Sequence, residues 1–218
     1  MEYDIEQLTV EMIKNQADFN GKVVLEIGCG GGEISSLLAN DTEQYIGIDP
    51  DISAINDASQ AYHNVDFRIG NGESLSFSDS GFDIVLFTLS LHHQNSSLAI
   101  KEAYRVLKNE GKLIIIEPSI KGEFQLFFHL FNDETKEIGN AYHSLINYDF
   151  NLENQDSFNA IVRFEDKADL CSYSFDRDTI ASGDSNLIIE KLNQIQPGSS
   201  DNAPIILKDI IDIYLLTK

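Results

Sequence analysis

The sequence predicts an α/β fold in which a mostly parallel sheet is wound with helices on both faces. Two features support it: apolar runs alternate with helical patterns, and a glycine cluster follows the first apolar run. Such alternation is typical of β-α-β units, whose parallel strands are buried on both faces. The apolar runs lie near residues 22–28, 44–49, 65–69, 82–88 and 112–117, and the helical patterns near 31–40, 52–61 and 96–108.

A helix is expected ahead of the first strand, within residues 1–20. Ile5, Leu8 and Met12 recur at helical spacing, and Asp4 before them can accept hydrogen bonds from the first helical N–H groups. In a doubly wound sheet, ligands bind at the carboxyl ends of the strands, where the strand order reverses. The residues that follow each predicted strand are therefore the candidate site.

The first strand runs directly into the glycine cluster. Gly28, Gly30 and Gly32 lack Cβ atoms, so the main chain there can approach a ligand closely. The dinucleotide fingerprint G-x-G-x-x-G is the obvious competitor, but Glu33 stands at its third glycine position. The charge of Glu33 would also repel a pyrophosphate at the helix N-terminus. We therefore expect a ligand without phosphates.

Two carboxylates narrow the ligand further. Asp49 ends the second apolar run, where it can accept hydrogen bonds from both hydroxyls of a ribose. Glu26 precedes the first glycine and can accept a hydrogen bond from a cationic amino group. The expected ligand thus has a ribose and a cationic group.

These segments resemble ordered motifs of the class I S-adenosylmethionine-dependent methyltransferases. The stretch from Glu26 to Gly32 looks like the family's E-x-G-x-G-x-G motif, and Asp49-Pro50-Asp51 resembles its second-strand end. Residues 67–73 are similar to the stretch that usually reads G-D-A-E beside the adenine, with Asn71 in place of the aspartate. Residues 82–93 resemble the fourth strand and its exit loop, and residues 103–113 resemble the fifth-strand region of the ubiquinone and menaquinone C-methyltransferases.

The resemblance implies a Rossmann-like, doubly wound, mostly parallel seven-stranded sheet with an antiparallel final strand. It implies one domain over residues 1–218, in which the variable segments 1–20 and 118–205 form the acceptor side. The implied cofactor is S-adenosylmethionine, with S-adenosylhomocysteine as product. The implied donor-site residues are Glu26, Gly28, Gly30, Gly32, Asp49, Pro50, Asn71, Gly72 and Thr88.

The resemblance also implies a role for each contact. Pro50 would offer an apolar surface to the adenine, Asn71 would accept from the adenine amino group, and Gly72 would present its N–H to the ring. Thr88 would lie beside the methionine portion.

Methyl transfer requires few catalytic groups, because the methyl group of a sulfonium is already electrophilic and positioning of the acceptor supplies ~7–11 kcal/mol. Deprotonation of the acceptor can still need a general base. His92 and His93, after the fourth strand, are the candidates; the alternative is that this pair only structures its loop. Two adjacent histidines without a third ligand at metal spacing make half a site, so no metal is predicted.

The region after Pro118 has fewer motifs. Phe124, Phe127, Phe128 and Phe131 recur at helical spacing. Their face is expected to be core or a homodimer surface, or a lid on the methyl acceptor. Further elements are expected as a helix within 133–147 and strands at 170–175 and 210–216, with a turn at Gly183.

Composition limits the partners. The 36 acidic and 15 basic side chains give a formal net charge of −21, which argues against nucleic acid because phosphates bind clustered Lys and Arg. Two cysteines form no disulfide framework, and no signal peptide or membrane-spanning run is found, so a cytoplasmic protein without stable membrane insertion is expected.

The predicted function is methylation of a small molecule by in-line displacement. The alternative is a catalytically silent module that acts through protein contact.

Overall fold

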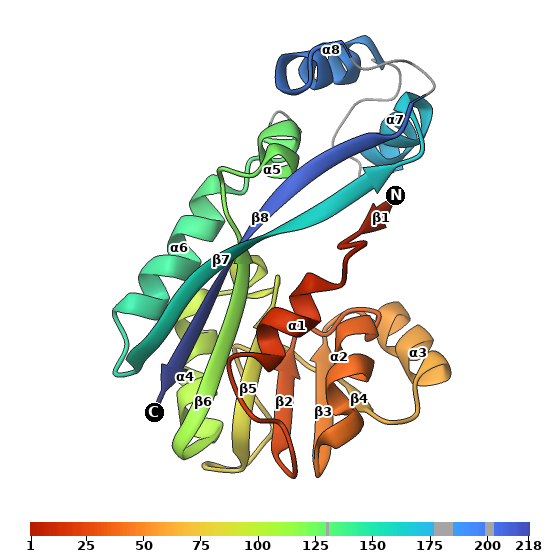
Figure 1. Cartoon of the computed structure of the whole chain (residues 1–218). Coiled ribbons are helices and arrows are strands. Elements are labelled where there is room, and N and C mark those ends of the chain that lie inside the picture. The colour runs from red at the N-terminus through yellow and green to blue at the C-terminus, as the bar shows by residue number, and fades with distance from the viewer. Residues whose placement is uncertain (130, 177–184, 199–202) are drawn as a thin grey trace. The chain divides into compact units, whose positions relative to one another are not determined.

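The computed structural model describes residues 1–129, 131–176, 185–198 and 203–218. Within them, eight strands form one mixed sheet with the order β1-β7-β8-β6-β5-β2-β3-β4 (Figure 1). The strands are β1 (Glu2–Tyr3), β2 (Val23–Ile27), β3 (Gln44–Asp49), β4 (Asp66–Ile69), β5 (Phe82–Thr88), β6 (Leu107–Pro118), β7 (Asn151–Phe164) and β8 (Ile205–Thr217).

The helices follow the predicted alternation through the first half of the chain. They are α1 (Leu8–Lys14), α2 (Glu33–Leu38), α3 (Ile52–Ala61), α4 (Ser96–Val106), α5 (Glu123–Phe128), α6 (Thr135–Ile146), α7 (Lys167–Asp176) and α8 (Ser185–Ile195), with short 3₁₀ turns η1 (Ala39–Asp41) and η2 (Leu91–His93). None of the helices in this described part combines the length and the hydrophobicity needed to cross a lipid bilayer.

The α/β prediction is confirmed, but the predicted count of seven strands is wrong. Two of the eight strands were not predicted. One is β1, whose Glu2 and Tyr3 pair antiparallel with Arg163 and Val162 of β7. Two residues are too short to produce a periodic pattern in the sequence. The other is β7, none of which was predicted; its first half, residues 151–157, is exposed and mostly polar.

The centre of the sheet is parallel. β2 pairs with β3 and β5, β3 pairs with β4, and β5 pairs with β6, all in parallel register. At the start of β6, the N–H of Glu110 donates to Lys218 O at 3.3 Å and the N–H of Lys218 donates to Gly111 O at 3.2 Å. The end of β8 therefore lies beside the start of β6, and these two strands run in opposite directions.

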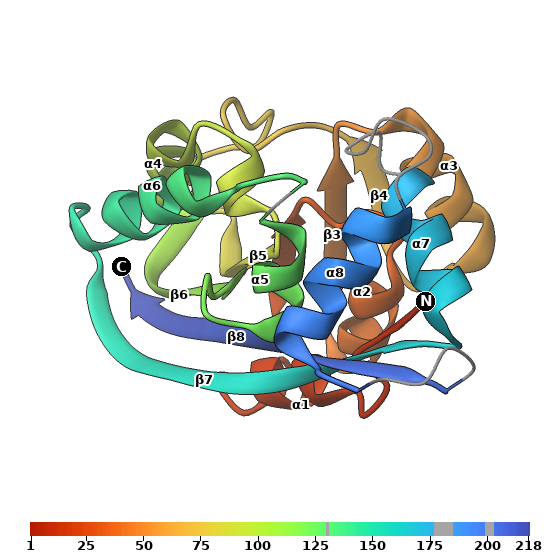
Figure 2. The same ribbon diagram turned by 90° about the horizontal axis from the view of Figure 1, so that it is seen from above.

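The chain divides into two compact units. One, the sheet unit, comprises Thr9–Glu117, Glu137–Ser157 and Asp212–Lys218; the other, the aromatic unit, comprises Met1–Leu8, Pro118–Lys136 and Phe158–Ile211. In the sheet unit, α4 and α6 lie on one side of the sheet and α1 lies on the other (Figure 2). Its core includes Leu25, Val85 and Phe87 of the strands, Ala99 and Ala103 of α4, and Leu145 of α6.

The aromatic unit has a core of its own. Phe124 and Phe127 of α5 are buried in it against strand residues such as Phe164, and Phe128 and Phe131 pack at its margin. The aromatic face of the sequence is therefore core of this unit. The strand predicted at 170–175 is wrong, because these residues lie in α7. Asp166 Oδ1 accepts from the N–H groups of Ala168 and Asp169, which starts that helix. The turn predicted at Gly183 lies outside the described residues.

Candidate functional site

A cleft of about 450 Å³ opens in the sheet unit at the carboxyl ends of β2, β3 and β5. All of the predicted donor-site residues except Gly32 line it, and His93 lines it as well. The location is the one expected for the ligand of a doubly wound parallel sheet. Other lining residues are Ile27, Cys29, Gly31, Glu33, Ile34, Gly70, Leu89, Ser90 and Gln94.

Gly28 is held in a conformation that suits only glycine. Its φ of +80° lies in the left-handed region. A Cβ there would lie 2.3 Å from the Cβ of Ser90, because the loop after β5 passes directly against this turn. The Ser90 hydroxyl donates to Ile27 O at 2.6 Å, which fixes this close approach. Gly28 thus joins the ends of β2 and β5.

The other two glycines of the turn differ in what surrounds them. Gly30 has φ +51° and no heavy atom within 4 Å of an added Cβ, so its backbone borders open space. Gly32 has φ +81°, and a Cβ there would lie 2.5 Å from the Phe67 ring. Gly32 is also the N-cap of α2 and does not line the cleft. The absence of a side chain at Gly32 leaves room for the ring of Phe67 to pack against the turn.

Asp49 ties the end of β3 to the glycine turn. Its Oδ2 accepts from the N–H of Gly30 at 2.9 Å, and its Oδ1 accepts from the N–H of Asp51 at 2.9 Å. Asp51 in turn caps α3 by accepting from the N–H of Ser53. Each carboxylate oxygen of Asp49 has a further lone pair, so the group can still accept from a ligand hydroxyl.

Glu26 is buried at the base of the cleft, with 1% of its surface exposed. Three hydroxyl groups donate to its carboxylate: Ser35 at 2.5 Å, Thr88 at 2.5 Å and Tyr45 at 2.8 Å. Burial raises the pKa of Glu26, and these hydrogen bonds oppose the rise only in part. Among the described residues, no Lys or Arg forms an ion pair with it. The site therefore holds a carboxyl group that has no cationic partner in the part of the chain that the structure describes.

The predicted adenine end is already hydrogen-bonded within the protein. Asn71 Oδ1 accepts from the N–H of Ser74 at 3.2 Å, as in a turn. The N–H of Gly72 donates to Gln94 Oε1 at 3.0 Å, and Gln94 Nε2 donates to Ser90 O at 3.1 Å. Sequence reasoning missed Gln94 and Ser90, because their partners lie on other loops and leave no local pattern.

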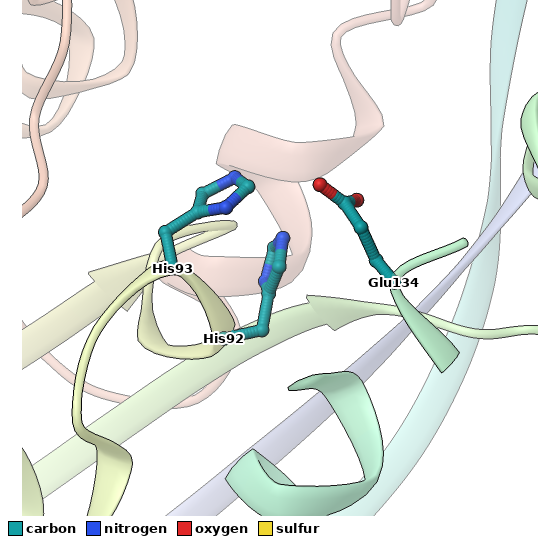
Figure 3. A group of neighbouring side chains, drawn as sticks. All are labelled: His92, His93 and Glu134. Atoms are coloured by element: carbon teal, nitrogen blue, oxygen red, sulfur yellow. The ribbon is translucent and has the colours of Figure 1, made fainter. Parts of the chain in front are cut away.

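The two candidate histidines have different surroundings. His92 is 5% exposed, and its Nδ1 is hydrogen-bonded to Glu117 Oε2. Glu117 Oε1 also accepts from the N–H of Leu91 at 2.8 Å, so this carboxylate fixes the turn that carries both histidines. His93 is exposed and lines the cleft. Figure 3 shows the two rings projecting side by side, with centroids 3.8 Å apart and planes tilted by 46°.

The contact with Glu117 orients the ring of His92, which does not line the cleft. A carboxylate that accepts from Nδ1 of a histidine favours the tautomer in which Nε2 is the basic nitrogen. Glu117 was missed by sequence reasoning because it looks like an ordinary end of an apolar strand. The only signal for it was its position at the carboxyl end of that strand.

Comparison with known proteins agrees with this geometry. Residues 25–115 match the family described as methyltransferase domain. The uncharacterized methyltransferase YcgJ of Bacillus subtilis is 32% identical over 100 residues, which cover 43% of this chain and 40% of YcgJ. The demethylmenaquinone methyltransferase of Lactococcus lactis is 29% identical over 131 residues, which cover 53% of this chain and 52% of that protein. The chain thus spans about half the length of these curated relatives or less.

Solved structures share the fold over nearly the whole chain. The crystal structure of YcgJ has a TM-score of 0.70 at 20% identity and covers 97% of this chain and 98% of its own. The structure of the [4+2]-cyclase SpnF has a TM-score of 0.64 at 18% identity, and the match covers 97% of this chain and 80% of the SpnF chain. At these identities the likeness concerns the fold alone, and the name of SpnF indicates that the fold is compatible with more than one reaction. The sequence match over residues 25–115 and the curated relatives support a class I S-adenosylmethionine-dependent methyltransferase.

Proposed function

We propose that the chain transfers a methyl group from S-adenosylmethionine to a small-molecule acceptor by in-line displacement. The observation that carries this proposal is the environment of Glu26, which is buried beside the cleft and hydrogen-bonded to three hydroxyl groups. A buried carboxylate is costly unless a cation compensates its charge. The donor carries two cationic groups, an ammonium and a sulfonium, so its methionine portion fits this position.

The remaining residues of the cleft suit the rest of the donor. Its volume of about 450 Å³ is typical of a small-ligand pocket. Asp49 would accept from the ribose hydroxyls, the open backbone at Gly30 would admit the nucleoside, and Pro50 would cover the adenine. Asn71 would accept from the adenine amino group once its side chain leaves Ser74. When bound, S-adenosylmethionine supplies an electrophilic methyl group.

The chain itself then has to orient the acceptor and remove its proton. We propose His93 as the general base, because it is exposed at the cleft and lies beside the ring of His92. General-base catalysis of this kind contributes typically ~10²–10⁴-fold. His92 would act by positioning the turn, since Glu117 holds it.

For the acceptor we propose a small molecule bound with help from segments 1–20 and 118–205, within one domain over residues 1–218. The net charge of −21 supports this over nucleic acid. Demethylmenaquinone methyltransferase, among the relatives, is named for a small-molecule acceptor. A cytoplasmic location is also proposed, supported by Cys29 and Cys171, which form no disulfide with each other.

Calorimetry tests the donor first. S-adenosylmethionine and S-adenosylhomocysteine should bind with one site per chain, whereas NAD should not bind because its pyrophosphate would meet Glu33. Binding of NAD without binding of either sulfur ligand would overturn the assignment. A second experiment supplies the donor with a tritiated methyl group and fractionated small metabolites. Label should pass to a compound of low molecular mass, and label found only on macromolecules would reject the proposed acceptor class.

The alternative of a silent protein-contact module has lost its main support. It relied on the Phe124 to Phe131 face as an interface, but Phe124 and Phe127 are buried in the core of the aromatic unit. A homodimer through this face is disfavoured for the same reason.

A further inference from the structure

One side chain bridges two loops of the cleft. Gln94 accepts from the N–H of Gly72 with its Oε1, at 3.0 Å, and donates from its Nε2 to Ser90 O, at 3.1 Å. Gly72 belongs to the loop after β4, and Ser90 belongs to the loop after β5. The side-chain amide of Gln94 therefore forms one hydrogen bond to each of the two loops.

The bridge continues to the glycine turn. Ser90 donates to Ile27 O at 2.6 Å, and its Cβ occupies the space that a side chain at Gly28 would need. A Cβ at Gly72 would similarly lie 2.4 Å from Gln94 Oε1 and 2.9 Å from the side chain of Ile27. The loops after β2, β4 and β5 are thus linked through the Gln94 amide and Ser90.

From this arrangement we infer that Gln94 is a positioning residue for the methyl donor. It holds the Gly70 to Gly72 loop, at the predicted adenine end, in register with the Ser90 loop and the glycine turn. Fixing loops in their binding conformation raises affinity because less ordering is left to occur on binding. A second consequence is that the N–H of Gly72 is satisfied by Gln94, so adenine recognition relies on other groups of this loop. The inference rests on the proposed function.

The test uses three variants of the full chain. Gln94→Met keeps the length and much of the volume of the side chain but removes both hydrogen bonds. Gln94→Glu keeps the acceptor for the N–H of Gly72 and loses the donor to Ser90. Gln60→Met is the matched control, because Gln60 is exposed on α3 and does not line the cleft.

Two quantities are measured: the Kd for S-adenosylhomocysteine by calorimetry, and the exchange rate of the Gly72 amide hydrogen by NMR without ligand. Gln94→Met should raise the Kd by about tenfold and speed Gly72 exchange, as expected for losing preorganising hydrogen bonds. Gln94→Glu should restore protection of Gly72 and recover part of the affinity. Gln60→Met should change neither quantity.

The outcomes separate this inference from the proposed function. If wild type binds and Gln94→Met binds equally well or more tightly, Gln94 does not position the donor, even if the variant has a lower thermal midpoint. If Gly72 exchange is the same in wild type and Gln94→Met, the bridge does not exist in solution. If wild type itself fails to bind S-adenosylhomocysteine, the proposed function is overturned, and the inference is overturned with it.

Discussion

The main-chain N–H of Gly30 donates a 2.9 Å hydrogen bond to Asp49 Oδ2, so the carboxylate predicted to hold a ribose also holds the glycine turn. The two roles are compatible, since a carboxylate oxygen can accept more than one hydrogen bond. They also mean that a substitution at Asp49 acts on the ligand and on the turn together.

Asp49→Ala should weaken S-adenosylhomocysteine binding by ~1–3 kcal/mol, because charge-assisted hydrogen bonds to the ribose are lost. Calorimetry measures the change. Asp49→Asn is the control, since one side-chain oxygen remains to accept from Gly30; it should bind more tightly than Asp49→Ala. Unchanged affinity in both variants would reject the ribose role.

Glu26→Gln tests whether the buried carboxylate serves a cationic ligand. The substitution keeps the shape and removes the charge, so binding of S-adenosylmethionine should weaken by ~1–3 kcal/mol. S-adenosylhomocysteine lacks the sulfonium and should lose less. Equal losses for both ligands would indicate that Glu26 interacts with the amino group alone, and no loss would remove Glu26 from the site.

The same variant should be more stable than wild type at high pH. Burial raises the pKa of Glu26, so its protonated form is favoured in the fold. This contribution to stability is present at low pH and is lost as pH rises through the raised pKa. Thermal midpoints measured without ligand from pH 5 to pH 9 should therefore fall more for wild type than for Glu26→Gln. If the thermal midpoints of wild type and Glu26→Gln fall equally with pH, the carboxyl group of Glu26 does not couple folding to pH.

Gly28 and Gly30 form a matched pair for the backbone argument. Both have positive φ, so alanine at either position costs roughly 1–2 kcal/mol. At Gly28 the new Cβ would also meet Ser90, which adds roughly 1–3 kcal/mol of overpacking. Urea unfolding should rank Gly28→Ala below Gly30→Ala in stability. Equal stability would show that the Ser90 contact relaxes at no cost.

Substitution of His92 should mainly lower stability, whereas substitution of His93 should mainly lower turnover. His92→Ala leaves Glu117 buried without one partner and should cost roughly 1–3 kcal/mol of unfolding free energy. His93→Ala removes an exposed ring and should stay within about 0.5 kcal/mol of wild type. With an identified acceptor, His93→Ala should lower kcat by ~10²–10⁴-fold if it is the base. Full turnover in His93→Ala would end that assignment.

Within residues 22–117 of the sheet unit, the strands and the longer helices could be predicted because each carries a local signal. The apolar runs around Val85 and Ile115 are long enough to be recognised, and Asp51 and Asn95 cap their helices with side chains that can be read directly. Positions such as Gly28 and Asp49 could be placed because strand ends converge at one edge of a parallel sheet.

The parts that could not be predicted depend on contacts distant in sequence. The exposed half of β7 is polar, so its strand conformation comes from its neighbours in the sheet. The apolar pattern at 170–175 predicts a strand, but Asp166 caps a helix that begins just before these residues. Gln94 and Glu117 could not be assigned, because their partners lie 22 and 25 residues away.

The aromatic unit contains a buried carboxyl group that should make its stability depend on pH. Asp209 of β8 is 2% exposed, and its Oδ2 accepts from the Tyr3 hydroxyl of β1 at 2.9 Å. Its Oδ1 has no hydrogen-bond partner among the described residues, and the backbone at Gly122 lies against it. Burial raises the pKa of Asp209 to about 7, and the hydrogen bond from Tyr3 opposes this rise.

Because the pKa of Asp209 is higher in the fold than in the unfolded chain, its contribution to stability is full below about pH 4 and is lost as pH rises to about 7. The loss is roughly 4 kcal/mol, at 1.36 kcal/mol for each pKa unit. Urea unfolding at pH 5 and pH 8 should show wild type less stable at pH 8, and Asp209→Asn should flatten this dependence because it cannot ionise. Asp156→Asn, on the exposed part of β7, is the control and should keep the wild-type slope. An equal slope in wild type and Asp209→Asn would mean that Asp209 is solvated in solution and does not couple folding to pH.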